Sequence, residues 1–328
     1  MSFSKPFLFS AAIAVLTWIA WFGYSAPETL AILEAHWPVS LTMVFGSFIA
    51  GATSEGGGAV AFPVFTKWLK IAPFDAKVFS LAIQSVGMTA ASLVIVAMRI
   101  AVAWPVILWA SLGGLIGMPF SALLLAPLLP SALLKMLFTA MIVSFALPLS
   151  IVNWQRRLYN DTIPIFGWQE KSIWLSTGFV GGCMTGLVGN GIDIICFSVM
   201  VLLFRLSEKI STPTSVVLMA INALAGFLLH LFVIGGFSEQ VERYWLAAVP
   251  VVVVGAPFGA YCCTKLNNTT IASVLIALIV VELISSLLLI PLTATITGVS
   301  LAVFVFFSLV YYRLARSKRY RPCNQGEP

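Results

Sequence analysis

The sequence predicts an all-α, polytopic membrane protein made of two internal repeats, with one extra span at each end. The chain is 60% hydrophobic and only 9% charged, whereas about a quarter of the residues in ordinary soluble domains are charged. Apolar runs recur from end to end, and most are close to the roughly 20 residues that cross a bilayer as a helix. Four consecutive runs in the first half have counterparts in the second half. These observations together indicate the fold class.

Residues 1–40 are expected to hold a first span and an external loop. The apolar run at 7–21 follows Lys5 and precedes small residues, a pattern that also fits a cleaved signal peptide. We favour a retained span, because polytopic proteins rarely need such cleavage. Residues 26–40 contain no Lys or Arg, and this predicts that they lie outside the cell.

The first predicted repeat occupies residues 41–153, and the second occupies residues 174–291 after a polar loop at 154–173. Each repeat has four apolar elements, of which the first is interrupted by glycines. The expected elements are 41–66, 76–98, 103–126 and 132–153 in the first repeat, and 174–204, 211–234, 244–263 and 269–290 in the second.

The final region, 292–328, combines a span at about 293–314 with a basic tail. Basic residues next to a last span favour a cytoplasmic location under the positive-inside rule. We therefore expect a multi-pass protein of the inner (plasma) membrane with both termini in the cytoplasm.

Identical residues at constant offsets support the internal repeat. At an offset of 135 residues the matches are Gly46/Gly181, Gly51/Gly186, Gly56/Gly191, Phe62/Phe197, Val64/Val199 and Ser80/Ser215. At an offset of 138 they are Gly117/Gly255, Pro119/Pro257, Phe120/Phe258 and Ala122/Ala260. A difference of three residues corresponds to a loop of another length.

The glycine-broken segments leave two topologies open. If each crosses the membrane fully, the halves are parallel; if each re-enters, the halves are inverted. Counting Lys and Arg leaves 13 of the 18 inside under either topology, so charge does not decide. Inverted repeats are common where helices are broken, and we favour them.

Backbone groups at the two breaks are candidates for binding an anion. Glycine lets the chain leave helical geometry, and freed N–H groups at a half-helix start attract negative charge. The candidates are Gly56, Gly57, Gly58, Gly189, Asn190 and Gly191. The four-residue spacing of Gly178, Gly182 and Gly186, and of Gly113/Gly117 and Gly255/Gly259, predicts close helix packing instead.

Two carboxylates stand at the breaks, Glu55 in the first and Asp193 in the second. A charged group is costly in hydrocarbon, so intramembrane acids usually face a cavity and carry function. We predict that both couple transport to protons. The alternative is that each caps the start of a half-helix.

Polar residues follow each break at helical spacing. Ser80 and Gln84, and in the second half Ser215 and Asn222, are candidate substrate contacts, although Ser often bonds to its own helix. His230 and Glu282 are also intramembrane, and we expect both to make satisfied contacts between helices.

The sequence gives no support to several other functions. It contains no HExxH, GxSxG or P-loop motif, so no catalytic residues are assigned. The five cysteines form no CxxC pair, and no metal or cofactor is expected. The net charge of +6 does not indicate nucleic-acid binding, because five basic residues belong to the tail.

At these residues the chain resembles the sulfite exporter TauE/SafE family of bacterial anion permeases. The resemblance covers about 41–290 and rests on the glycine run before Pro63, on Ser80 and Ser215, and on the stretches GMPF at 117–120 and GAPFGA at 255–260. It implies movement of sulfite, sulfonates or related small anions, often outward. The chain departs from the family pattern by reading NGID at the second break and by adding Glu55 at the first.

The sequence as a whole predicts a secondary transporter, in the exporting direction, for a small sulfur-containing or carboxylate anion, coupled to protons. An uptake permease of the same architecture and a non-transporting membrane subunit or intramembrane enzyme are the alternatives. The expected partners are the anion, protons and the lipid bilayer, and a homo-oligomer is compatible with the sequence. Substrate identity and oligomeric state are left open.

Overall fold

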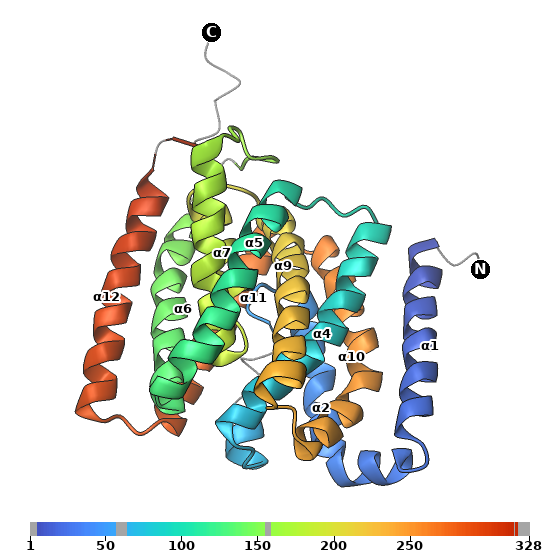
Figure 1. Ribbon diagram of the computed structural model, residues 1–328. Coiled ribbons are helices and arrows are strands. Elements are labelled where there is room, and N and C mark those ends of the chain that lie inside the picture. Colours follow the sequence, from blue (N-terminus) through green and yellow to red (C-terminus); the bar gives the residue numbers. More distant parts are fainter. Residues whose placement is uncertain (1–4, 57–63, 155–158, 318, 321–328) are drawn as a thin grey trace.

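The computed structural model describes residues 5–56, 64–154, 159–317 and 319–320, and all its regular structure is helical (Figure 1). The helices are α1 (Lys5–Ser25), α2 (Thr29–Ala52), α4 (Pro73–Ala97), α5 (Trp104–Phe120), α6 (Ser131–Trp154), α7 (Trp168–Val188), α8 (Ile192–Leu202), α9 (Glu208–Leu229), α10 (Glu239–Lys265), α11 (Asn268–Leu289) and α12 (Ala294–Arg316). Short π or 3-10 turns add η1 (Val64–Trp68), η2 (Ser121–Leu125), η3 (Ala126–Leu128) and η4 (His230–Ile234). Within these residues nine helices, all except α7 and α8, are long and apolar enough to cross a membrane.

The helix ends follow local capping chemistry, and most lie within a few residues of the expected ones. α4 begins at Pro73. Proline has no backbone N–H, and this costs nothing in the first turn of a helix, where N–H groups have no partner within the helix. α11 begins after Asn267, whose side chain accepts a hydrogen bond from Thr270 N at 2.7 Å.

Residues 29–40, which we expected in a loop, are instead helical as the first part of α2. His36 has non-helical φ and ψ values of −120° and 21°, and Pro38 follows two residues later. Proline cannot donate to the preceding turn and disfavours helical geometry before it. The long apolar part of α2 therefore begins after a kink at His36 and Pro38. The turns before the kink carry polar residues and so were predicted as a loop.

The second broken segment forms a re-entrant hairpin. α7 ends at Val188, just before Gly189, which has φ of +88°, and α8 begins after Gly191, which has φ of +148°. Phe204, just beyond α8, stacks on Trp174 near the start of α7 with ring centroids 4.9 Å apart. The chain thus returns to the face from which it entered, the upper face in Figure 1.

The first broken segment returns in the same way to the lower face. Phe65 of η1 belongs to one buried cluster with Val39 and Met43 of α2, so the chain after the break comes back beside the first half of that helix. The two hairpins therefore enter from opposite faces, as the inverted topology requires.

Glycines allow each hairpin to pack closely on a spanning helix of the other half. A Cβ at Gly51 of α2 would overlap the carbonyl oxygen of Ala256 of α10. A Cβ at Gly178 of α7 would overlap the carbonyl oxygen of Ala110 of α5. The close packing predicted from glycine spacing is confirmed for Gly113, Gly117, Gly178, Gly182, Gly186, Gly255 and Gly259.

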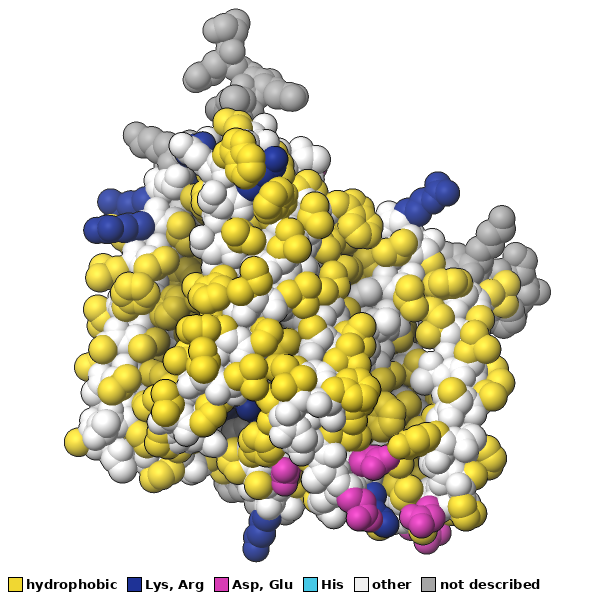
Figure 2. Space-filling model, in the orientation of Figure 1, with side chains coloured by type: hydrophobic (Ala, Val, Ile, Leu, Met, Phe, Trp, Pro, Cys, Tyr) yellow, Lys and Arg dark blue, Asp and Glu magenta, His cyan; other side chains and the backbone are white. Residues whose placement is uncertain are grey.

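The outside of the bundle is apolar between two charged ends. Hydrophobic side chains cover the middle of the face in Figure 2, with acidic side chains gathered at its lower end and most basic ones at its upper end. α1 begins and α12 ends toward the upper face (Figure 1). An apolar belt of this kind is what contact with lipid requires.

Candidate functional site

The two chain breaks meet in the interior of the protein. The side-chain amide of Asn190 donates a hydrogen bond to the backbone carbonyl of Glu55, with 2.5 Å between the atoms. Gly56 has φ of +74°, and a Cβ there would lie 2.9 Å from Asn190 Nδ2 and 3.4 Å from Asp193 Oδ2. Glycine at position 56 is therefore required both by its backbone angle and by the close approach of the second break.

The two predicted proton carriers, Glu55 and Asp193, are each 1% exposed. Asp193 lies in the first turn of α8, and its Oδ1 accepts a hydrogen bond from Ile194 N at 2.9 Å. This oxygen therefore bonds to a backbone N–H at the start of α8, as expected under the alternative hypothesis that the acid caps a half-helix. Asp193 Oδ2 and both carboxylate oxygens of Glu55 have no hydrogen-bond partner among the described residues, so these oxygens are available to a proton.

A cavity of about 50 Å³ lies beside this meeting point. Its polar lining consists of Ser47, Ser80, Gln84, Lys135 and Asn190. Gln84 Nε2 donates to Ser80 Oγ at 2.6 Å and to the carbonyl oxygen of Gly189 at 3.2 Å, so α4 holds the second break in place. Gln84 Oε1 has no partner among the residues that the structure describes. We call this space the central cavity.

Other predicted contacts lie elsewhere. Ser215 and Asn222 of α9 are buried but do not line the central cavity. Ser215 Oγ and Asn222 Nδ2 donate to carbonyl oxygens of their own helix, at 2.8 Å and 3.0 Å. Gly191 precedes α8 and faces Met184, while Gly57 and Gly58 lie outside the described residues. Substrate contact by these five residues remains a prediction.

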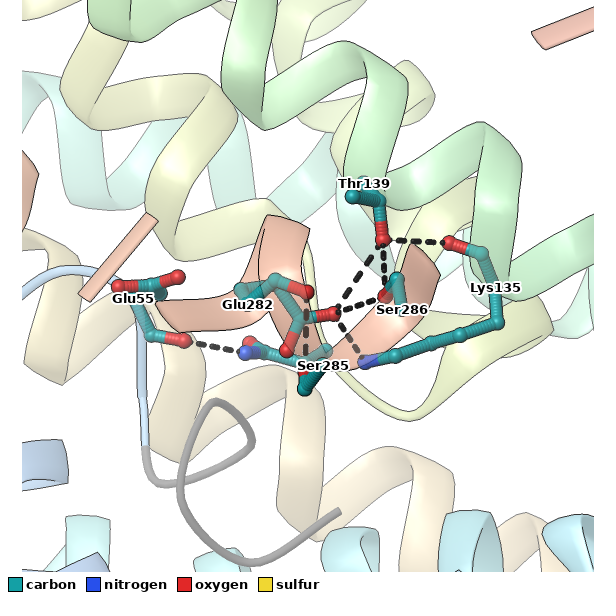
Figure 3. Close-up of polar contacts among 7 residues, drawn as sticks. Glu55, Lys135, Thr139, Glu282, Ser285 and Ser286 are labelled. Atoms are coloured by element: carbon teal, nitrogen blue, oxygen red, sulfur yellow. Dashed lines mark hydrogen bonds and ion pairs between the residues drawn. The ribbon is translucent and has the colours of Figure 1, made fainter. Parts of the chain in front are cut away.

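Lys135, which was not among the predicted site residues, projects from α6 into the central cavity. Its Nζ lies 2.7 Å from Glu282 Oε1 of α11, and both side chains are almost fully buried. Thr139 and Ser286 each donate to the same Glu282 oxygen at 3.3 Å (Figure 3). Glu282 Oε1 makes the contact between helices that we expected, whereas Glu282 Oε2 has no hydrogen-bond partner among the described residues, so the carboxylate is satisfied only in part. A lysine in the first turns of an apolar element is the signal that could have identified Lys135.

His230 departs from its expected role. It is 1% exposed, and neither ring nitrogen has a hydrogen-bond partner among the described residues. Its ring lies at the edge of Phe74, with centroids 5.9 Å apart. The polar contact between helices that we expected for this side chain is absent from the described structure.

Comparison with known proteins gives one match. A family model described as "Sulfite exporter TauE/SafE" matches residues 39–286, most of the chain, including both breaks and the central cavity. No curated protein and no solved structure matches the chain.

Proposed function

Because the chain belongs to the sulfite exporter TauE/SafE family of membrane transporters, we propose that it carries a small anion across the membrane in the outward direction. The substrate class is sulfite, a sulfonate, or a related sulfur-containing or carboxylate anion. The central cavity is the proposed binding site, and movement is driven by ion gradients.

The observation that carries this proposal is the meeting of the two breaks beside a cavity whose mostly apolar wall holds a few polar side chains. Asn190 joins the breaks through its bond to the Glu55 carbonyl, and Asn190, Ser80 and Gln84 also line the cavity. Broken helices meeting in the interior are the usual setting of a transporter substrate site. Amide and hydroxyl donors suit an oxyanion, and Lys135 lies beside them in its ion pair with Glu282.

Glu55 and Asp193 are the proposed proton carriers. Three of their four carboxylate oxygens have no hydrogen-bond partner among the described residues. Glu55 lies at the first break and Asp193 at the second, where the two breaks meet, and we expect this contact to rearrange when substrate passes. Protonation would remove the repulsion between these acids and an arriving anion. Substrate and proton would then occupy neighbouring positions in one transport cycle.

The charge distribution supports the orientation that we propose. The acidic lower end and the more basic upper end in Figure 2 fit an upper face in the cytoplasm under the positive-inside rule. α1 begins and α12 ends toward this upper face, so both termini are proposed to be cytoplasmic. The first hairpin would then enter from outside the cell and the second from the cytoplasm.

Counterflow in proteoliposomes tests the function. Vesicles loaded with unlabelled sulfite, a short sulfonate or a carboxylate are diluted into the labelled anion, and uptake is followed. We expect exchange of at least one sulfur anion, which Ser80→Ala slows several-fold. Ser92→Ala is the matched control, because Ser92 also lies half-buried on α4 but bonds only to its own helix, at Met88 O. No exchange of any anion would refute the proposal.

A further inference from the structure

A second and larger cavity opens near the lower ends of α4 and α6, and Lys135 and His230 are among the residues that line it. Its volume is about 280 Å³, against about 50 Å³ for the central cavity. Pro73, Pro127 and Ser131 at its rim are exposed, whereas Lys77, Lys135 and His230 in its wall are buried. We call this space the basic vestibule.

The charge of the basic vestibule is positive. Its described lining includes two lysines and a histidine and neither Asp nor Glu. Lys135 is balanced by Glu282. For Lys77 the described contacts are a long hydrogen bond to Gly186 O at 3.5 Å and the ring of Phe74 at 5.1 Å, and the described ion pairs do not include it.

A buried ammonium without a carboxylate is costly unless another negative group approaches it. The carbonyl end of α7 supplies part of that charge, since Gly186 lies in its last turn. A bound anion would supply the rest. His230, with both ring nitrogens unpartnered among the described residues and its side chain in the same wall, offers a second hydrogen-bond donor.

The basic vestibule adjoins the central cavity. Lys135 and Val188 line both spaces, and Val188 is the last residue of α7 before the second break. Apolar groups, among them Phe74, Leu134 and Leu187, form the remaining wall. A cationic end beside an apolar wall fits an anion with a short carbon chain better than a bare inorganic ion.

From this geometry we propose that the basic vestibule is a second anion site, held by Lys77 and His230, which receives an organic sulfonate on its way between the central cavity and the lower face. This inference rests on the proposed function for the identity of the anion. Binding at the vestibule is nevertheless measurable without transport, so the two can fail separately.

Titration of the purified protein with ethanesulfonate tests the site. We expect Lys77→Met to weaken binding at least about tenfold, because a desolvated charged partner is lost, and Lys77→Arg to retain most of it. The matched control is Lys70→Met, which removes the same charge from an exposed position outside the cavity. Equal affinity in the protein and in Lys77→Met would overturn the second site, while counterflow in the same preparations would still report on the proposed function.

An anionic lipid headgroup, like a free sulfonate, presents a singly charged oxyanion, so it could occupy the same site. The titration is therefore made in nanodiscs of phosphatidylcholine and again with phosphatidylglycerol added. We expect the same affinity in both. Displacement of ethanesulfonate by phosphatidylglycerol would assign the vestibule to lipid and overturn the proposal.

A second measurement does not depend on the choice of ligand. Ser131→Cys places a thiol at the rim, in a background without the native cysteines. We expect a negatively charged methanethiosulfonate to react faster than a positively charged one, and Lys77→Met to lower this ratio about fivefold, as one charge within several ångströms does. An unchanged ratio would show that Lys77 does not set the potential of the vestibule.

Discussion

Removal of Lys135 is expected to destabilise the protein strongly unless Glu282 is neutralised with it. The ammonium and carboxylate are 2.7 Å apart and 6% and 1% exposed, and Thr139 and Ser286 donate to the same carboxylate oxygen. Lys135→Met leaves that carboxylate buried without its cation, which costs about 3–5 kcal/mol. For a chain of this size we expect the apparent Tm to fall by roughly 6–20 °C.

The double variant Lys135→Met/Glu282→Gln removes both charges. The glutamine amide can still accept a hydrogen bond from Thr139 or Ser286. The loss in free energy of unfolding in the double variant should therefore be smaller than the sum of the losses in the two single variants, by at least about 2 kcal/mol. Thermal unfolding of the four proteins in one detergent gives this coupling directly. Additive losses would refute the reasoning, because they would show that the two charges do not stabilise one another.

The same cycle separates structure from transport. If Lys135 also attracts the substrate in the central cavity, the double variant regains stability but its counterflow stays slow. Recovery of both together would limit Lys135 to a structural role.

Three further predictions concern other parts of the fold. Gly51→Ala should lower stability by about 1–3 kcal/mol, because the added Cβ meets only backbone atoms of α10, with Ala256 C 2.8 Å away; Gly298→Ala, with nothing within 4 Å, should be neutral or slightly stabilising in the same thermal assay. Tyr320 donates a 2.5 Å hydrogen bond that lowers the pKa of Glu170 at the upper end of α7. The stability due to this shift is complete above the ordinary pKa of Glu170 and is lost as the pH falls through its lower folded pKa, so Tyr320→Phe should flatten the acid limb of stability against pH, and an unchanged limb would contradict this. Asp193→Asn should abolish transport driven by a pH gradient while leaving counterflow; transport that still follows the gradient would remove Asp193 from the coupling step.

Much of the fold could be predicted from the sequence. A bilayer requires about 20 apolar residues for each crossing, so hydropathy alone places α4, α6 and α11 within a few residues of where they lie. Proline and capping residues mark several ends. Glycines at four-residue spacing predict close packing because a missing side chain lets two helices approach wherever they meet.

The candidate site was predicted less completely. The glycine breaks identified Glu55, Gly56, Asn190 and Asp193, which the structure does bring together. The facing of Ser215 and Asn222 was not predictable, because residues 211–220 of α9 are all buried and the surrounding sequence shows no polar stripe that would mark the cavity side. Serine and asparagine then bond to their own helix as easily as to a ligand.

By itself, then, the sequence determined the limits of most apolar elements, the positions of the two breaks and the residues at them, because these depend on local composition and on what hydrocarbon tolerates. Only the tertiary structure decided that the broken segments return to the faces they enter from, that Lys135 pairs with Glu282, and that Lys77 and His230 share one vestibule. Those relations join residues distant in the chain. They depend on how each helix is rotated about its axis, and hydropathy does not fix that rotation when lipid and protein interior are equally apolar.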